Sequence, residues 1–571
     1  MVNTSNKTKE ISGFRLVAGY IGMFLVLIGI ISAIPLLVIP FHQSDLPALP
    51  IFGGVSGANI VLGLLLYFVF IFKRKRSRLV RRQESLLLLL AWIAAIVSGA
   101  APFYIATLMG KMNMGVAQSI FESTSGYSTT GLTVFSGYID VEGAFCPYVY
   151  TFHRALTNFI GGVGLVLLIA SLLGAGGGGM SLYVSEGHSD RILPNVAHTA
   201  KLIFGIYLFY TLIGIVALTI AGMPVFDAIC HSMSALSGGG FSPRADNIAA
   251  YRSLEGLVLP GGVTPVCSLA IEIIMMVLVV LSAISFMSHT FLLRGRFGRF
   301  FRDDEIRFGL LSFFFAIVIG LIPVLVATAA SGVSFWEDAA EALRCDLFYV
   351  IGCMTNSGFA STSADGTRFL YHIIPGGSGG QLFMGHTFVF ILIILMLVGG
   401  GAGSTAGGIK QYRVALCFRN LQYSIRYRFA SIHQHYPRVT NRYGQRNQLE
   451  DSEVGEAYRY MLLFVLLFLV LTGALCMIEP NLFSVESAAF DVASAISNTG
   501  LSWIVGPTYG ALGTAPSLAV LWLLSVGMLL GRLEVYPAAY AIASIGLETR
   551  YHIETRRRRK REAAFEINEG E

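Results

Sequence analysis

The sequence predicts an all-α polytopic membrane protein in which one unit of helices occurs four times. The chain has 571 residues, of which 54% are hydrophobic and only 13% are charged, and its mean hydropathy is +0.67. Because soluble domains carry about a quarter charged residues, this composition indicates an integral membrane protein. The second observation is a glycine motif that occurs four times, each time between two long apolar segments.

In each copy of the motif, a small or polar residue precedes the glycine and an apolar residue follows it. The glycines, called the turn glycines below, are Gly131, Gly240, Gly358 and Gly500. A short amphipathic helix precedes each one, so the repeated unit is a helix, a short re-entrant helix, a polar turn and a second helix. Irregular backbone at membrane depth is tolerated only where it lines a cavity or is buried in protein. Four such hairpins therefore predict one central pore.

Two apolar segments, 14–39 and 55–72, precede the repeats, and each is long enough to cross a bilayer. They contain no glycine turn of this kind, so we interpret them as two extra transmembrane helices. The predicted units are an N-terminal helix hairpin with a basic loop at 1–83, pore repeats at 84–198, 199–304, 305–454 and 455–547, and a basic cytoplasmic tail at 548–571. A polar linker at about 419–455 ends the third repeat.

Each repeat supplies a first helix, a hairpin and a second helix in the same order. The first helices are predicted at 84–106, 200–222, 306–331 and 456–478, the hairpins near 116–131, 225–240, 340–358 and 486–500, and the second helices at 148–173, 264–291, 386–412 and 515–546. Clusters of Lys and Arg at 73–82, 294–307, 410–446 and 550–561 fall on one side of this arrangement. The positive-inside rule makes that side cytoplasmic, which gives ten spans, two cytoplasmic termini and hairpins that enter from outside.

The glycine turns have two interpretations. They are either helix caps and close-packing points, which are common in membrane proteins, or a ring of carbonyl oxygens that replaces the water shell of a cation. Glycine suits the second role because it adopts backbone angles that other residues resist. Four aligned copies favour it, and each short helix would direct its C-terminal end, where a cation is stabilised, at the pore.

Two acidic residues stand in the same register of their hairpins. Glu122 and Asp491 each follow a phenylalanine in the short helix. They either attract cations toward the turns or accept hydrogen bonds within the hairpin, and both interpretations stay open at this point.

The sequence gives no support for an enzyme. The segment 401–406 fits GxGxxA, but a dinucleotide site needs an acidic residue about 20 positions later, and no Asp or Glu occurs from 410 to 449. Ser404 has no histidine in a later span to act as its base. The seven cysteines are scattered without a CxxC pair, so neither a transition-metal site nor a disulfide framework is expected. The net charge of +6 follows the topology and does not indicate a nucleic-acid partner.

Several motifs resemble one family. They are RALTNFIGGVG at 154–164, TAK at 199–201, Glu272 within IEIIMM, GGGAGSTAGGIK at 399–410 and GRLEVYP at 531–537. With the four turns, these motifs resemble the Trk/Ktr/HKT superfamily of potassium transporters, most closely the bacterial TrkH-type potassium uptake subunit. The resemblance extends from about Arg82 to Tyr540. His153, Asn158 and Phe159 depart from the usual pattern, which has tryptophan, glutamine and tryptophan there.

The resemblance implies four helix–pore-helix–filter–helix repeats around one central pore, preceded by two extra transmembrane helices. It implies that the selectivity filter is formed by Thr129, Thr130, Gly131, Gly238, Gly239, Gly240, Asn356, Ser357, Gly358, Asn498, Thr499 and Gly500. Glycine at all four key positions is the potassium-type pattern. Carbonyl dipoles carry no full charge, which also favours a monovalent cation, although this argument alone does not rank potassium above sodium.

The resemblance also implies a gate below the filter, where a glycine-rich loop interrupts the second helix of the third repeat. The implied gating residues are Gly399, Gly400, Gly401, Gly403, Ser404, Thr405, Gly407, Gly408, Lys410 and Arg532. Alternatives remain: a kinked helix without a gating role, an ion pair between Arg532 and Glu534, and a Lys410 side chain that only reaches the membrane surface.

The expected function is potassium uptake across the bacterial cytoplasmic (inner) membrane, with K⁺ as the transported ion and no cofactor in this chain. The alternatives are a sodium- or proton-coupled potassium symporter, or a less selective pathway for K⁺ and Na⁺. The expected partners are a second copy of the chain in a homodimer, a cytosolic nucleotide-binding regulatory ring subunit, and membrane lipid at the basic tail.

Overall fold

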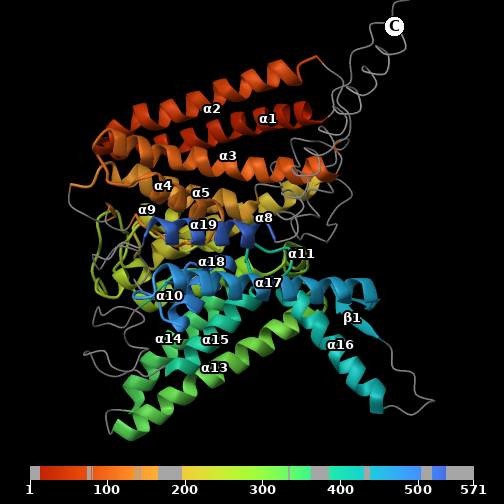
Figure 1. The fold of residues 1–571 in the computed structure, drawn as a ribbon. Coiled ribbons are helices and arrows are strands. Elements are labelled where there is room, and N and C mark those ends of the chain that lie inside the picture. The colour runs from red at the N-terminus through yellow and green to blue at the C-terminus, as the bar shows by residue number, and fades with distance from the viewer. Residues whose placement is uncertain are drawn as a thin grey trace, which may run out of the picture.

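A computed structural model gives the fold as a bundle of long and short helices (Figure 1). It describes residues 13–73, 79, 81–135, 138–139, 143–164, 196–331, 335–361, 385–429, 438–502 and 517–534. Two antiparallel helices, α1 (Phe14–Ala33) and α2 (Leu49–Phe70), lie at one edge beside α3 (Arg81–Leu108). Glycines let α1 and α2 touch, because a Cβ on Gly63 would lie 2.6 Å from the carbonyl oxygen of Gly22.

The four predicted repeats follow in order. The first contains α3, α4 (Val116–Tyr127) and α5 (Pro147–Val163); the second contains α8 (Val196–Ile220), α9 (Val225–Leu236), α10 (Ser268–Ala283) and α11 (Phe286–Leu293); the third contains α13 (Asp304–Ser331), α14 (Phe335–Thr355) and α15 (Gly385–Val398); the fourth contains α17 (Asp451–Ile478), α18 (Val485–Ile496) and α19 (Leu518–Arg532). We call α4, α9, α14 and α18 the pore helices. Three of them have 12 residues, whereas α14 has 21 and begins before the predicted start at 340.

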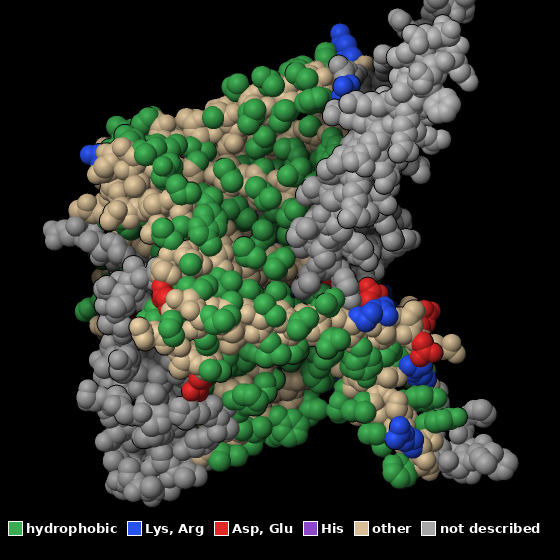
Figure 2. Space-filling view, viewed as in Figure 1, with side chains coloured by type: hydrophobic (Ala, Val, Ile, Leu, Met, Phe, Trp, Pro, Cys, Tyr) green, Lys and Arg blue, Asp and Glu red, His purple; other side chains and the backbone are tan. Residues whose placement is uncertain are grey.

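The described residues include six helices long and apolar enough to cross a membrane, or seven if the bent pair α10 and α11 forms one span. Many of their outward side chains are large and apolar; Val61 and Phe314, for example, are 66% and 60% exposed. Hydrophobic side chains cover much of the face shown in Figure 2, while charged side chains gather near α16 (Gln411–Phe429) and the adjacent end of α17. This surface is that of a membrane protein with a polar end.

The second helix of the second repeat is not continuous, which corrects the predicted span at 264–291. α10 ends at Ala283, α11 begins at Phe286, and the two helices meet at a bend of 115°. The predicted interruption of the third repeat is present, since α15 ends at Val398 and α16 begins at Gln411. The two breaks contact each other, as described below.

The polar linker between the third and fourth repeats contains regular secondary structure. It contains α16 and an antiparallel hairpin of β1 (Val439–Arg442) and β2 (Gln445–Gln448), so the chain is not entirely helical. Tyr443 and Gly444 between the strands have φ of 54° and 73°, as a two-residue hairpin turn requires. Asp303 accepts a hydrogen bond from the Tyr443 backbone N–H at 2.7 Å, which attaches the hairpin to the start of α13.

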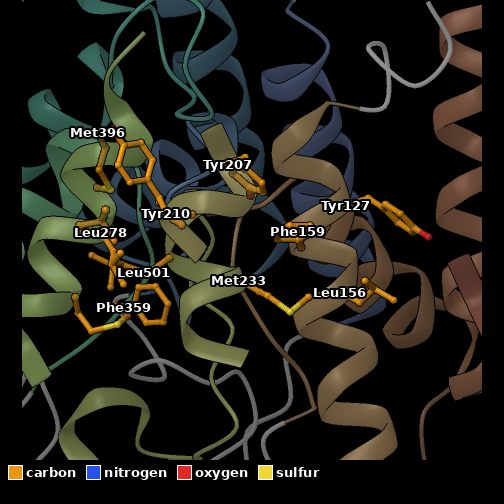
Figure 3. Close-up of a cluster of buried hydrophobic side chains, with 14 of the residues drawn as sticks. Tyr127, Leu156, Phe159, Tyr207, Tyr210, Met233, Leu278, Phe359, Met396 and Leu501 are labelled. Atoms are coloured by element: carbon orange, nitrogen blue, oxygen red, sulfur yellow. The ribbon is translucent and has the colours of Figure 1, made fainter. Parts of the chain in front are cut away.

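Apolar side chains from all four repeats meet in a shared core (Figure 3). It includes Tyr127 and Met233 from the pore helices of the first two repeats, and Phe359 and Leu501, which directly follow the turn glycines of the last two. The apolar residue after each of these two glycines is thus buried in the core, and it anchors one end of its turn.

Candidate functional site

The four glycine turns share one backbone geometry. The residue two positions before each turn glycine has a positive φ, with values of 58° at Thr129, 72° at Gly238, 54° at Asn356 and 57° at Asn498. The next residue donates its backbone N–H to the carbonyl oxygen five residues earlier, at 2.8–2.9 Å in every repeat. This is the left-handed ending typical of helix C-termini. Each pore helix therefore ends with the same backbone geometry.

The turn glycines lie against one another in the order of the repeats. A Cβ built on Gly131 would lie 2.8 Å from the Cα of Gly240, and one on Gly240 would lie 2.5 Å from the Cα of Gly358. The corresponding distances are 3.0 Å from Gly358 to Gly500 and 2.9 Å from Gly500 back to Gly131. Real Cβ atoms essentially never come within 3.0 Å of such atoms, and a Cβ on Gly358 would also lie 2.6 Å from the carbonyl oxygen of Thr499. The four glycines therefore form a closed ring with no space for a side chain.

Hydrogen bonds connect the turns to their neighbours around this ring. Asn356 donates to the Thr499 hydroxyl at 3.0 Å, and Asn498 donates to the Thr130 hydroxyl at the same distance. The Ser357 hydroxyl donates to the carbonyl oxygen of Gly239 at 2.9 Å. These three contacts join the third turn to the fourth, the fourth to the first, and the third to the second.

The same asparagines also attach the turns to the second helices. The Asn356 side-chain amide donates to the carbonyl oxygen of Met396, and that of Asn498 donates to the carbonyl oxygen of Met528, both at 2.9 Å. Asn158 of α5 donates to the Ser234 hydroxyl on α9 at 3.0 Å and so joins the first repeat to the second. Asn158, one of the residues that depart from the resembled pattern, therefore contacts the pore helix that precedes the second turn.

Two carbonyl oxygens of the second turn accept hydrogen bonds from side chains. Asn247 donates its side-chain amide to the carbonyl oxygen of Gly240 at 3.0 Å, and Ser357 occupies one side of the Gly239 oxygen. A carbonyl oxygen has two lone pairs, so one acceptor position remains on each. The four turns thus form a closed ring, but their carbonyl oxygens are not chemically equivalent.

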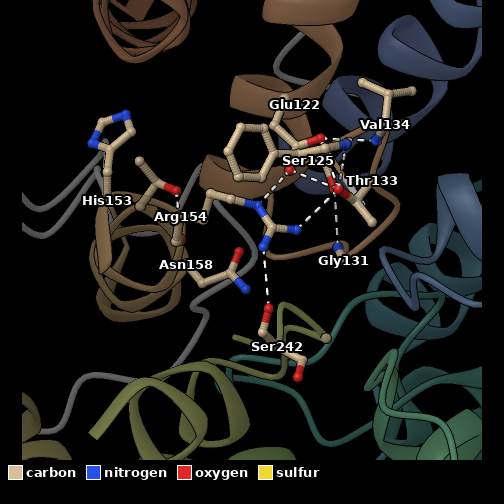
Figure 4. A network of polar contacts seen from close by, with 12 residues as sticks. Glu122, Ser125, Gly131, Thr133, Val134, His153, Arg154, Asn158 and Ser242 are labelled. Carbon is tan, nitrogen blue, oxygen red and sulfur yellow. Dashed lines mark hydrogen bonds and ion pairs between the residues drawn. The ribbon is translucent and has the colours of Figure 1, made fainter. Parts of the chain in front are cut away.

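The two acidic residues of the hairpins are buried and hydrogen-bonded, as the second interpretation predicted. Glu122 accepts from the Arg154 guanidinium at 2.7 Å, the Thr133 hydroxyl at 2.8 Å and the Val134 backbone N–H at 2.9 Å (Figure 4). Asp491 accepts from the Ser502 hydroxyl at 3.0 Å. These carboxylates hold their own hairpins.

The glycine-rich segment at 399–410 lies directly against the turns. A Cβ on Gly407 would lie 1.8 Å from the carbonyl oxygen of Ser497 at the end of the fourth pore helix, and one on Gly238 would lie 3.3 Å from the Thr405 hydroxyl. The Thr405 hydroxyl donates to the carbonyl oxygen of Ser282 at 2.9 Å. We call this segment, 399–410, the glycine loop.

The glycine loop supplies the backbone partners that the broken helix of the second repeat lacks. Gly401 donates its N–H to Ala283 at 2.8 Å, and Phe286 donates to Gly403 at 3.0 Å. The carbonyl oxygen of Ser282 also accepts from the Thr405 N–H at 3.2 Å. Two interrupted helices satisfy each other's backbone groups, which is the condition for irregular backbone at membrane depth.

Two basic side chains from the predicted gating set lie at this loop. The Arg532 guanidinium donates to the carbonyl oxygens of Thr405 at 2.7 Å and Gly161 at 2.5 Å. The Lys410 ammonium donates to the carbonyl oxygen of Ala406. Glu534, the alternative partner considered for Arg532, forms an ion pair with Arg413 at 2.8 Å. Arg532 therefore joins the glycine loop to the second helix of the first repeat.

Two features were not predicted from the sequence. One is the break at Ile284, and the other is the set of side-chain hydrogen bonds made by the second and third turns. Within the predicted span at 264–291, the stretch 268–291 contains no glycine or proline, so only Ser282 and Ser285 could have marked the break. In the part of the chain that the structure describes, no group of three His, Cys, Asp or Glu side chains is arranged to hold a metal ion.

Comparison with known proteins relates this fold to cation transporters. Residues 58–548 match the TrkH family, described as a cation transport protein. The Trk system potassium uptake protein TrkH of Halomonas elongata is 29% identical over 84% of this chain and 88% of its own length. TrkG of Escherichia coli is 28% identical over 81% of this chain and 85% of its own. An uncharacterized cation transporter of Methanocaldococcus jannaschii is 26% identical over 95% and 97%.

A solved structure has the same fold. The crystal structure of the potassium transporter TrkH from Vibrio parahaemolyticus matches with a TM-score of 0.70 and 24% identity, covering 92% of this chain and 98% of that one. The match confirms the predicted fold class, a helical polytopic membrane protein. The family consists of transport proteins, in agreement with the prediction that the chain is not an enzyme.

Proposed function

The chain belongs to the TrkH family of cation transport proteins, and from this premise we propose that it carries potassium ions into the cell across the cytoplasmic membrane. The observation that carries the proposal is the closed ring of Gly131, Gly240, Gly358 and Gly500. Four turns that meet at one axis give a single path along which backbone carbonyls replace the water around an ion. Relatives that bear the name of potassium uptake proteins support potassium as the ion.

The ion path runs between the turns at 129–131, 238–240, 356–358 and 498–500. The pore helices direct their C-terminal ends at it, and the helix dipole favours a cation there. Uptake follows the membrane potential, which is worth about 2.3 kcal/mol per charge per 100 mV. The division of the chain into units at 1–83, 84–198, 199–304, 305–454, 455–547 and 548–571 forms part of the proposal.

The glycine loop is the gate of this path. It lies against Ser497 and Gly238, next to the ring, and the backbone hydrogen bonds to α10 and α11 hold it there. Glycines give it the conformational freedom to leave this position, and Arg532 holds it by its contact with Thr405. Release of the loop opens the path.

The proposed assembly is a homodimer in the bacterial inner membrane with both termini in the cytoplasm. A cytosolic nucleotide-binding ring subunit docks beneath, where α16 carries Arg426 and Arg428 in its last turn. The tail at 548–571, proposed to contact lipid, lies outside the described residues.

A coupled potassium symporter is the second candidate, together with a less selective pathway for potassium and sodium. The specific observation in favour of the symporter is the pair of broken helices, α10–α11 and α15–α16. Coupled transporters place such breaks at their ion and substrate sites.

Ion flux through the purified protein in proteoliposomes tests the proposal. We expect rubidium or potassium uptake driven by membrane potential alone, with sodium uptake far slower. A requirement for a sodium or proton gradient would favour the symporter, and equal rubidium and sodium fluxes would favour the less selective pathway. Absence of flux of any alkali ion from vesicles that contain correctly folded protein would contradict the proposed function.

A further inference from the structure

The residue nine positions before each turn glycine occupies an equivalent place in all four repeats. These residues are Glu122, His231, Tyr349 and Asp491, and each lies on a pore helix. Their side chains differ in chemistry, yet none is more than 2% exposed. Buried polar groups at equivalent positions are expected to have equivalent partners.

Each of the four contacts the segment that leaves its own turn. Glu122 accepts from the Thr133 hydroxyl at 2.8 Å, and Asp491 accepts from the Ser502 hydroxyl at 3.0 Å. The His231 ring nitrogen Nε2 lies 3.1 Å from the Ser242 hydroxyl. The Tyr349 hydroxyl donates to the carbonyl oxygen of Ser361 at 2.5 Å and accepts from its backbone N–H at 3.0 Å.

The partner stands two residues after the glycine in three repeats and three residues after it in the third. The helix ending fixes the inner side of the turn, which precedes the glycine. This contact fixes the outer side, which follows the glycine. We call the four contacts the braces.

Two arginines extend the braces from one repeat to the next. Arg154 contacts Glu122 and Thr133 in the first repeat and donates to the carbonyl oxygen of Ser242 in the second at 3.2 Å (Figure 4). Arg252 of the second repeat donates to Glu272 at 2.7 Å and to the Ser361 hydroxyl of the third at 3.0 Å. Each arginine therefore forms a buried ion pair within its own repeat and a hydrogen bond to the residue that follows the turn of the next repeat.

We propose that Glu122, His231, Tyr349 and Asp491 are positioning residues that set the spacing of the carbonyls in the four glycine turns and thereby the ion selectivity. This inference rests on the proposed function, because it assigns the braces to the same ion path. Each brace is buried, so the loss of one partner removes a hydrogen bond that water does not replace. The outer end of that turn then moves to find another partner.

The test removes one hydroxyl at a time. Ser242→Ala and Ser502→Ala each delete one brace in a different repeat with almost no change in volume. Ser502→Thr restores the hydroxyl and is the conservative rescue. Ser484→Ala is the matched control, because Ser484 caps the same pore helix α18 by accepting from the Ser487 N–H, and among the described residues its hydrogen bonds do not reach a turn.

The ratio of rubidium to sodium uptake in proteoliposomes is the main readout. Loss of one buried hydrogen bond corresponds to roughly a three- to tenfold change in an equilibrium, and we expect the ratio to fall by about that factor in Ser242→Ala and Ser502→Ala. Ser484→Ala should lower thermal stability and keep the wild-type ratio. A wild-type ratio in both folded brace variants would overturn the inference while leaving the proposed function intact.

Hydrogen exchange of the turn amides is the second readout, and it does not depend on transport. We expect faster exchange at the Gly500 amide in Ser502→Ala than in Ser484→Ala, and recovery in Ser502→Thr. If the wild-type protein carried no selective flux, the proposed function would fail, and unchanged protection of Gly500 would separately overturn the positioning role.

Discussion

At the scale of the residue, the absence of a Cβ decides what is possible along the axis. Gly131 and Gly500 have φ of 102° and 97°, which disfavours any other residue, whereas Gly240 and Gly358 do not adopt this conformation and are constrained by space alone. Lack of space also excludes a side chain where the second helix of the fourth repeat packs against its pore helix. A Cβ on Gly531 would lie 1.9 Å from the carbonyl oxygen of Ile496, at the last turn of a pore helix.

We therefore expect Gly531→Ala to destabilise the protein by about 1–3 kcal/mol, the usual range for an overpacked core. Gly473→Ala is the control, because Gly473 lies on α17 with no atom within 4 Å of the added methyl, and alanine favours the helix. Thermal unfolding in detergent measures both variants. Equal or higher stability of Gly531→Ala would show that α19 moves away from the pore helix without penalty.

The four glycine turns were visible in the sequence, whereas the contacts that form the braces were not. Glu122 and Asp491 are both carboxylates, so their shared register was visible. His231 and Tyr349 stand in the same register, but their different side chains concealed it until their contacts with Ser242 and Ser361 were known. Geometry, and not residue type, is what the four positions share.

At the scale of the element, two broken helices support each other. The break after Val398 was predictable because the glycine loop is rich in residues that weaken a helix. The break after Ala283 was not predictable, because its cause is tertiary: Gly401 and Thr405 donate to the last carbonyls of α10. An apolar run without glycine or proline gives no local signal for such a break.

The contact between Arg532 and the glycine loop leads to a prediction about flux. Arg532→Ala removes the donors to Thr405 and Gly161, and hydrogen bonds from a charged group are each worth about 1.5–3 kcal/mol. We expect basal rubidium flux to rise by about tenfold or more as the loop is released. Arg459→Ala, an exposed position on α17, is the control, and equal flux in the two variants would remove Arg532 from the gate.

The linker between the last two repeats shows the limit of composition as a guide. Its polar sequence predicted only a linker, and the structure contains α16 and the β1–β2 hairpin there. Asp304 explains much of this order, since its carboxylate pairs with Arg419 at 2.6 Å and accepts from the Asn441 N–H at 2.9 Å. Contacts between residues more than 100 positions apart are not visible in local sequence.

At the scale of the whole molecule, one chain forms four similar repeats, and each repeat can have its own sequence and structure. The repeat was predictable from the spacing of the turns, but the differences between quarters were not. The second turn has carbonyls engaged by Asn247 and Ser357, the third pore helix is longer, and the second repeat has a bent final helix. A ring of four identical subunits would have to repeat each of these features.

The central claim is that the four turns enclose a single ion path, and alanine at Gly240 or Gly358 tests it most directly. Their backbone conformations accept alanine, so the substitution tests only the space that the ring leaves. Gly205→Ala, with no atom within 4 Å of the added methyl, is the control. We predict that Gly240→Ala and Gly358→Ala each lose rubidium uptake or its preference over sodium in proteoliposomes while they still insert into the membrane. Wild-type uptake and wild-type preference in both variants would contradict the claim.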